Sequence, residues 1–454
     1  MQRADFPAGY APRSLPKGGA ARVATADAPP RMLPIGARVL LFCGFGVSAF
    51  LQRIGMWVGT SPVPLALPVV PLIMVFLAIS QIAQISKTRL LLFAALAGSA
   101  LISLLFAHDY YSITSIGMYI VCYGTFIFHV SMSEAAYNRY YKFILGAVAF
   151  ICFAGFAQWA LQYVVHIPFL FSWQGLVPKK FLIEYNTLNK ISLNAYFYKS
   201  NGFFLLEPSA LSQLAARALL LSVILFRRLR PLIPFGLGLI VAYSGTGLIL
   251  TMVFGAIPLL ILVFSEAKYR RLLVALSPLV VIVLAIFVWK FVPVSYFLGR
   301  TDEFSNPNTS GYMRFTGNFV AFQQYVLADW IRFLVGYGPG AAEGIVENIG
   351  RGVLPSCWIK LFLEYGLLGF STFTALFGYC IYSSTRSWYL TVAFLFHFLF
   401  LDGNLLVPQH VFVAYFMYML PVIAGQRQAK GVFDKTDTAV LPRSPQMPLR
   451  GARA

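Results

Sequence analysis

Basic residues in two long connections between apolar segments are the side chains best suited to chemistry in this sequence. Arg300 and Arg314 lie in the connection 293–355, and Lys199 lies in the connection 166–204. A guanidinium group can bind two phosphate oxygens at once, whereas the ammonium of lysine acts as a point charge. The pattern therefore favours a site for an anion, and beside a lipid bilayer a phosphate-containing head group is the natural ligand.

Two further basic residues lie inside predicted membrane spans. Arg217 lies about three turns into one span, and Lys360 lies one turn into another. An ionisable group at membrane depth costs roughly 2.5–3.5 kcal/mol on insertion scales, so it normally faces a partner or a cavity. Each residue could form a structural ion pair or line a polar cavity. Glu207 is too far from Arg217 along the same helix for a direct pair.

Acidic and imidazole groups supply the remaining candidates. Asp402 and His410 flank a predicted outer turn and could reach a cavity there. His129 and His397 lie in apolar segments, which is typical of core histidines with satisfied hydrogen bonds. The cysteines lie in or beside apolar segments without metal-ligand spacing, so we interpret them as small buried hydrophobes. We expect neither a metal nor a cofactor.

Composition identifies the class of protein that must position these groups. Of the 454 residues, 59% are hydrophobic and 11% are charged, and the mean hydropathy is +0.73. Soluble domains carry roughly 25% charged residues, whereas apolar stretches of roughly 17–25 residues recur here. A water-soluble globule, a single-span anchor and a lipid-attached soluble enzyme are excluded. We expect an all-α, polytopic membrane protein.

Hydropathy and helix-breaking residues predict about twelve spans. They are approximately 37–57, 63–85, 90–107, 113–131, 143–165, 205–226, 231–243, 247–264, 272–292, 356–378, 388–402 and 410–425. The tails 1–36 and 426–454 lack periodicity and are expected to be disordered. The transmembrane domain then covers 37–425.

The net charge of +19 indicates the orientation of this domain. Lys and Arg number 35 against 16 Asp and Glu, and with the amino terminus inside most of them fall in alternate connections and the tails. This is the positive-inside bias, so the charge does not indicate nucleic-acid binding. Both termini are predicted to be cytoplasmic, and the loops 166–204 and 293–355 are predicted to lie outside. Basic residues that the bias does not explain are Arg53, Lys179, Lys180, Lys190, Lys199, Arg217, Lys290, Arg300, Arg314, Arg332, Arg351 and Lys360.

Long outer loops usually carry function, and the second loop has two distinctive stretches. Phe315 to Val335 places apolar residues at helical spacing, so this amphipathic stretch could rest on the bilayer or on the bundle. Gly336-Tyr337-Gly338-Pro339-Gly340 lacks the Gly-Lys-Ser/Thr ending and the preceding strand of a phosphate loop. This argues against nucleotide binding.

Several short motifs, in order over about residues 195–370, resemble those of bacterial Wzy-type exopolysaccharide and O-antigen polymerases. They are Asn201-Gly202-Phe203-Phe204-Leu205-Leu206-Glu207-Pro208-Ser209, Tyr243-Ser244-Gly245-Thr246-Gly247, Arg300 with Ser310-Gly311-Tyr312-Met313-Arg314, Gly336 to Gly340, and Glu364-Tyr365-Gly366-Leu367-Leu368-Gly369. O-antigen ligases belong to the same superfamily and typically carry a His-Asn pair before the last of these motifs. Pro355-Ser356-Cys357-Trp358 has no histidine, which favours a polymerase.

The resemblance implies a GT-C-like glycosyltransferase in the bacterial inner membrane. Its donor would be an undecaprenyl-diphosphate-linked oligosaccharide, and its partners would be the lipid bilayer and a chain-length regulator. A diphosphate is already a good leaving group, so fixed cations that stabilise the departing charge would suffice without a metal. The implied catalytic residues are Arg300, Arg314 and Glu207; the implied substrate-binding residues are Lys199, Arg217, Lys360, His410 and Asp402.

Three points stay open at this stage. The general base, if one is needed, is one of Glu207, Asp302, Glu303, Asp402 and His410. A ligase that attaches finished glycan to lipid A core or protein would use the same donor. A flippase for the same lipid would be expected to show repeat symmetry and intramembrane charges in both halves.

Overall fold

The computed structural model describes residues 33–58, 61–107, 111–164, 170–184, 187–191, 196–265, 271, 306, 309, 311–349, 353–403 and 405–424. The predicted tail 426–454, most of the tail 1–36, the predicted span 272–292 and the residues Arg300, Asp302 and Glu303 lie outside these ranges.

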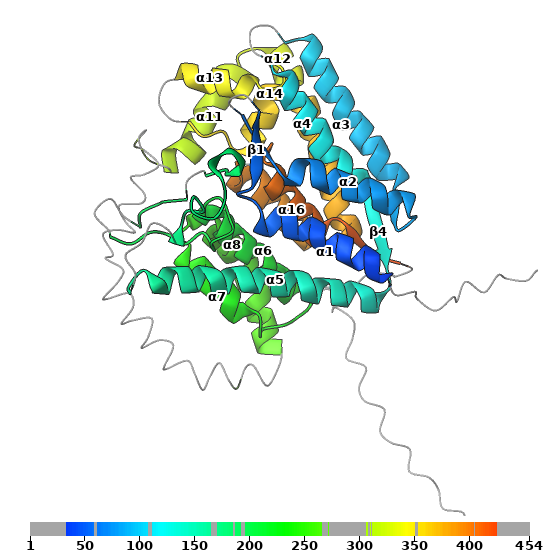
Figure 1. Ribbon diagram of the computed structural model, residues 1–454. Coiled ribbons are helices and arrows are strands. Elements are labelled where there is room, and N and C mark those ends of the chain that lie inside the picture. The colour runs from blue at the N-terminus through cyan, green and yellow to red at the C-terminus, as the bar shows by residue number, and fades with distance from the viewer. Residues whose placement is uncertain are drawn as a thin grey trace, which may run out of the picture.

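The described part of the chain is mainly helical (Figure 1). The helices are α1 (Ile35–Phe50), α2 (Ala66–Ile79), α3 (Lys87–Leu105), α4 (Ile113–Gly124), α5 (Glu134–Leu161), α6 (Pro208–Leu220), α7 (Leu232–Val241), α8 (Gly245–Ser265), α11 (Gly317–Ala321), α12 (Trp330–Val335), α13 (Ala341–Ile349), α14 (Cys357–Thr385), α15 (Trp388–Phe396) and α16 (Pro408–Tyr418). The short strands are β1 (Gly55–Val58), β2 (Ser61–Pro64), β3 (Ala83–Ile85), β4 (Phe128–Met132) and β5 (Pro421–Ile423).

Five helices are long and apolar enough to cross a membrane. They are α3, α5, α6 with its continuation to Leu225, α8 and α14. The expectation of a helical membrane protein is confirmed in this coarse form. Every side chain of α6 and of α16 is buried, so these two helices form the centre of the bundle, and α1, α7 and α8 pack around them.

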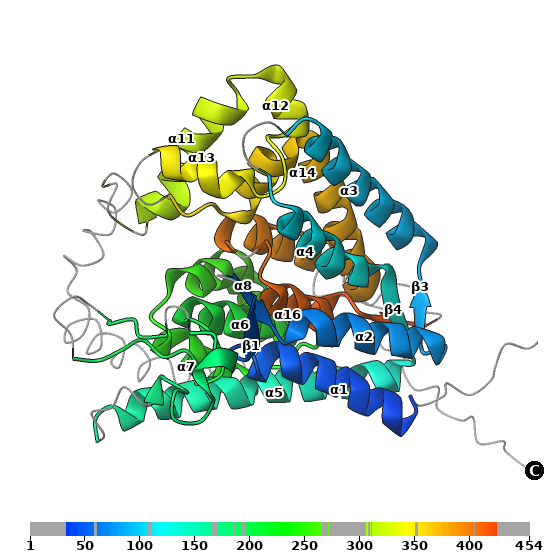
Figure 2. The same ribbon diagram turned by 45° about the horizontal axis from the view of Figure 1, so that its top comes forward.

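A three-stranded sheet lies at one end of the bundle (Figure 2), and we call this end the sheet end. Strand β3 pairs antiparallel with β4, and β4 pairs parallel with β5. These strands follow α2, α4 and α16 in the sequence, so three distant helix ends meet there. Helix α1 ends, and α6 and α16 begin, at the opposite end of the bundle.

Arg89, at the start of α3, ties the sheet end together. Its side chain is buried and donates hydrogen bonds to the carbonyl oxygens of Phe126 (3.3 Å), Phe128 (2.8 Å) and Met419 (2.8 Å), and to the hydroxyl of Ser383 (2.7 Å). In the sequence this arginine lies between two predicted spans, a position that gives no sign of a structural role. In the structure it joins the ends of α4, α14 and α16.

An antiparallel hairpin of β1 and β2 replaces the helix that was predicted at the end of span 37–57. That prediction was wrong because the apolar residues of this segment have the same hydropathy in a strand as in a helix. The hairpin depends on Gly55, where an added Cβ would lie 2.4 Å from the carbonyl oxygen of Val63. Helix α1 therefore ends at Phe50, and α2 begins at Ala66.

The amphipathic stretch 315–335 is not one continuous helix. It contains α11, a π-helical segment at Phe322–Val326, and then α12, with a break before Trp330. The ring of Phe322 lies 5.5 Å from that of Trp358 and 5.2 Å from that of Phe362 on α14. This stretch therefore packs on the bundle, while the Trp330 side chain is exposed.

The glycines of the loop Gly336–Gly340 allow its backbone to cross that of α14 at close range. The N–H of Tyr337 donates to the carbonyl of Leu363 (2.7 Å), and the N–H of Gly338 donates to that of Glu364 (3.1 Å). A Cβ at Gly336 would lie 2.5 Å from the Glu364 backbone, and a Cβ at Gly366 would lie 2.4 Å from the Leu334 backbone. Both glycines also have a positive φ. Two motifs of the resemblance thus meet each other in space.

The segment 170–184 of the first long loop is held against the end of α1 by a buried ion pair. Arg53 Nη2 lies 2.7 Å from Glu184 Oε1, and the Arg53 guanidinium lies over the ring of Trp173. Glu184 also accepts hydrogen bonds from Ser172, Gln174 and the backbone N–H of Trp173. Burial alone would raise the pKa of Glu184, but these hydrogen bonds and the charge of Arg53 outweigh it and lower the pKa.

This ion pair predicts a pH dependence of thermal stability. Because the pKa of Glu184 is lower in the folded state, its contribution is present above the unfolded value and is lost as pH falls through the folded value, below 4.5. We expect Glu184→Gln to lower the Tm by a few degrees at neutral pH and by less at acidic pH. The measurement is thermal unfolding in detergent at both pH values. Glu347→Gln alters an exposed carboxylate and should change the Tm at neither pH; a similar curve for both variants would contradict the assignment.

Candidate functional site

A turn before α6 positions the first candidate, Glu207. Gly202 and Phe203 both have a positive φ, and the Asn201 side chain accepts from the Phe203 N–H (3.1 Å) and donates to the Leu205 carbonyl (3.0 Å). The turn directs the chain into Pro208, which starts α6 because its missing N–H is not needed at that position. Glu207 is the half-buried residue before the helix, and it accepts a hydrogen bond from the Ser209 hydroxyl.

Two of the other predicted residues line one small cavity, which we call the α6–α16 cavity. Its lining comes from the end of α1, the segment before α6, α6 itself and α16, and consists of Gln52, Leu205, Ala210, Leu214, Arg217, His410 and Val413. Its volume is about 10 Å³, room for roughly one water molecule. From the sequence, Arg217 could form an ion pair or line a cavity. The structure shows that it lines a cavity.

Arg217 is the dominant charge in this region. Its side chain is 2% exposed, its Nε donates to the carbonyl of Gln213 one turn earlier, and its Nη1 has no hydrogen-bond partner among the described residues. Its charge acts on His410, His397 and Tyr418, while the carboxylate of Glu207 acts on His410. Glu207, Arg217 and His410 therefore form one electrostatic group.

His397 differs from the sequence-based interpretation. The imidazole is buried as predicted, but neither ring nitrogen has a hydrogen-bond partner within the described ranges. Burying an unpaired polar group is unfavourable, so the expectation of a satisfied core histidine was wrong. The ring lies within electrostatic range of Arg217 and His410.

Lys360 belongs to a second group near the start of α14. Its Nζ lies 3.4 Å from Oε1 of the exposed Glu343 and 3.7 Å from Oε1 of the fully buried Glu364. Of the two alternatives for Lys360, the structure thus shows the ion pair. The sequence analysis did not predict Glu364 as a partner, although its position one turn after Lys360 was a usable signal.

Asp402 and Arg314 are both linked to the start of α14 through their backbone carbonyls. The Asp402 carbonyl accepts from the Cys357 N–H (3.1 Å), and its side chain is buried. Asn318 donates from Nδ2 both to the Arg314 carbonyl and to the Ser356 hydroxyl (2.8 Å). The charges of Asp402 and Arg217 both act on the Tyr418 hydroxyl.

Other predicted residues are not joined to the cavity by the described contacts. Lys199 is half-buried, and its backbone N–H donates to the Asn189 carbonyl (2.7 Å). The half-buried Arg314 is absent from the residues that line the α6–α16 cavity. Gln52, Gln213 and Tyr418 contribute to the site and were not predicted, because single polar residues in apolar segments give no distinct signal.

Comparisons of the chain with protein-family models, with curated proteins and with solved structures find no match. In the part of the chain that the structure describes, no group of three or more His, Cys, Asp or Glu side chains is arranged to hold a metal ion. The chemistry available in the α6–α16 cavity is that of a buried guanidinium, an imidazole and a nearby carboxylate. Such a set can stabilise a developing negative charge and accept a proton.

Proposed function

We propose that the chain is an inner-membrane polysaccharide polymerase of the Wzy type. It would transfer a glycan chain from undecaprenyl diphosphate to the next lipid-linked repeat unit at the periplasmic face. The observation that carries this proposal is the α6–α16 cavity, where Arg217 and His410 meet beside Glu207. An incompletely hydrogen-bonded cation at membrane depth is costly to keep, which favours a functional role.

The proposed mechanism uses the side chains of Arg217, His410 and Glu207. The bond between the sugar and the diphosphate breaks as the acceptor hydroxyl attacks, and the diphosphate leaves with the bonding electrons. Arg217 would stabilise that charge, because a buried guanidinium acts more strongly there than in water. His410 and Glu207 are the two general-base candidates within this group, and either would accept the proton of the hydroxyl.

The proposal includes a membrane arrangement finer than the five long helices. About twelve spans would place both termini in the cytoplasm and the loops 166–204 and 293–355 in the periplasm, in a GT-C-like fold. This orientation puts the sheet end on the cytoplasmic side and the α6–α16 cavity near the periplasmic side. The sheet-end position of the basic residues Lys87 and Lys142 supports it, since positive charge is enriched inside.

Arg314→Ala tests the contribution of the second loop. The backbone carbonyl of Arg314 accepts a hydrogen bond from Asn318, which also binds Ser356 at the start of α14, and the half-buried Arg314 guanidinium would supply a cation for the lipid-linked diphosphate near this point. We expect normal amounts of folded protein in the membrane, accumulation of the single-repeat lipid and loss of long polymer, measured by gel profile and lipid extraction. Lys179→Ala removes an exposed charge from the first long loop and should leave polymer length unchanged. Normal polymer in the Arg314 variant would count against the proposal.

A further inference from the structure

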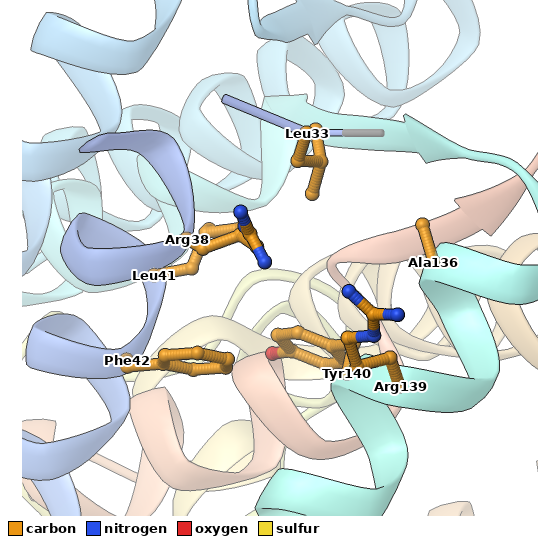
Figure 3. A pocket seen from close by; sticks show the side chains of 7 residues that line it. All are labelled: Leu33, Arg38, Leu41, Phe42, Ala136, Arg139 and Tyr140. Carbon is orange, nitrogen blue, oxygen red and sulfur yellow. The ribbon is translucent and has the colours of Figure 1, made fainter. Parts of the chain in front are cut away.

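A hollow between α1 and α5 at the sheet end is separate from the candidate site (Figure 3). It is lined by Leu33, Arg38, Leu41, Phe42, Ala136, Arg139 and Tyr140, and its volume is about 20 Å³, twice that of the α6–α16 cavity. The side chains of Arg38 and Arg139 extend into the hollow from the two helices, above the rings of Phe42 and Tyr140 (Figure 3). The hollow thus combines two cations with an apolar floor.

Neither guanidinium group is neutralised by the described part of the protein. Neither forms an ion pair with a described carboxylate. The Nε of Arg38 is buried and has no hydrogen-bond partner among the described residues. Buried donors are nearly always hydrogen-bonded, so this arrangement points to an acceptor supplied by another molecule. Arg38 is half-buried and Arg139 is exposed, so the two positive charges meet in an open hollow where they would attract an anion.

The surroundings of the hollow indicate which anion fits. Ile35 and Val39 on α1, and Phe143 on α5, have exposed apolar side chains beside it. The Phe143 ring stacks on that of Phe42, with centroids 3.8 Å apart, which continues the apolar floor outward. A soluble anion would gain nothing from this surface, whereas a lipid places its head group and its acyl chains side by side.

We propose that this hollow binds the head group of an anionic phospholipid. The two guanidinium groups hold the phosphate, and the first part of an acyl chain lies along Phe42 and Phe143. Two fixed positive charges without a carboxylate favour a lipid with net negative charge over a zwitterionic one. The site lies at the opposite end of the bundle from the α6–α16 cavity, so it does not depend on the proposed function.

The test is lipid retention by the full-length purified protein, measured by native mass spectrometry. The probes are phosphatidylglycerol and phosphatidylcholine of matched acyl chains. We expect wild type to retain phosphatidylglycerol over phosphatidylcholine, and Arg38→Gln/Arg139→Gln to bind it about tenfold more weakly. Lys87→Gln/Lys142→Gln removes two exposed charges from the same end, and should change binding by no more than about twofold.

Three results would overturn the proposal. The first is equal phosphatidylglycerol binding by wild type and the arginine double variant. The second is an equal loss in the lysine double variant, because binding would then depend on general surface charge. The third is inorganic phosphate that binds wild type as tightly as phosphatidylglycerol does, because the acyl chain would then contribute nothing to binding.

A measurement on wild type keeps the test decisive if the arginine double variant does not fold. Phosphatidylglycerol with a photoreactive head group should label peptides that contain residues 33–42 and 136–143. Labelling confined to other parts of the chain would contradict the assignment.

Discussion

Arg217→Gln should abolish long polymer, lowering synthesis by about 100-fold or more, while folded protein remains in the membrane. The guanidinium at this position is buried, makes one described hydrogen bond within its own helix, and faces the α6–α16 cavity with His410. A cation kept there for catalysis costs stability, so glutamine should leave the Tm unchanged or raise it. The measurement pairs polymer length in cells with thermal unfolding of the purified variant.

Arg217→Lys is the matched control for this prediction. Lysine keeps the positive charge but loses the planar, bidentate geometry, so we expect activity between that of wild type and that of the glutamine variant. A merely structural arginine would give a different pattern, in which both variants lose Tm and activity together. That pattern, or full activity in Arg217→Gln, would remove Arg217 from the mechanism.

Arg89→Ala is expected to have the largest effect on folding. The side chain holds three carbonyl oxygens and one hydroxyl that come from the ends of α4, α14 and α16. Hydrogen bonds from a charged donor contribute about 1.5–3 kcal/mol, and the buried carbonyls would lose their donor, so we expect a loss of at least ~3 kcal/mol. This is a large fraction of a typical unfolding free energy of roughly 5–15 kcal/mol. The loss of stability is measured as the yield of folded protein after detergent extraction and as the Tm of the purified variant.

The control for Arg89 lies on the first turn of the same helix. Lys87→Ala removes an exposed charge from α3 and should retain normal yield and Tm. Arg89→Lys should recover only part of the loss, because one ammonium cannot reach acceptors in three chain segments at once. A wild-type Tm for Arg89→Ala would show that the sheet end is held by other contacts.

The helices that sequence analysis located best are those whose apolar run is bounded by clear breaks. The predicted spans 247–264 and 388–402 correspond to α8 (Gly245–Ser265) and to α15 with its π-helical continuation to Leu401. Hydropathy records how apolar a segment is, not which backbone pairs with it. It therefore missed the hairpin 55–64 and the three-stranded sheet, both of which depend on backbone hydrogen bonds between segments.

The candidate site was predictable only as a set of residue types. A charge such as Arg217 inside an apolar run is visible in the sequence, and so is Lys360. The outcome for Arg217 depends on a residue far along the chain, because His410 shares its cavity, whereas Lys360 has one of its partners, Glu364, only one turn away. The same limit explains Arg89, since its acceptor Met419 lies 330 positions away.

We propose that the chain itself elongates a lipid-linked glycan by using the charge of Arg217. The direct measurement is incubation of purified protein with a lipid-diphospho-oligosaccharide, without nucleotide sugar, followed by separation of the products by size. Wild type should give a ladder of products that differ by one repeat unit, and folded Arg217→Gln should leave the substrate unchanged. A ladder of equal intensity from the Arg217→Gln variant, or unreacted substrate with folded wild type, would contradict the account.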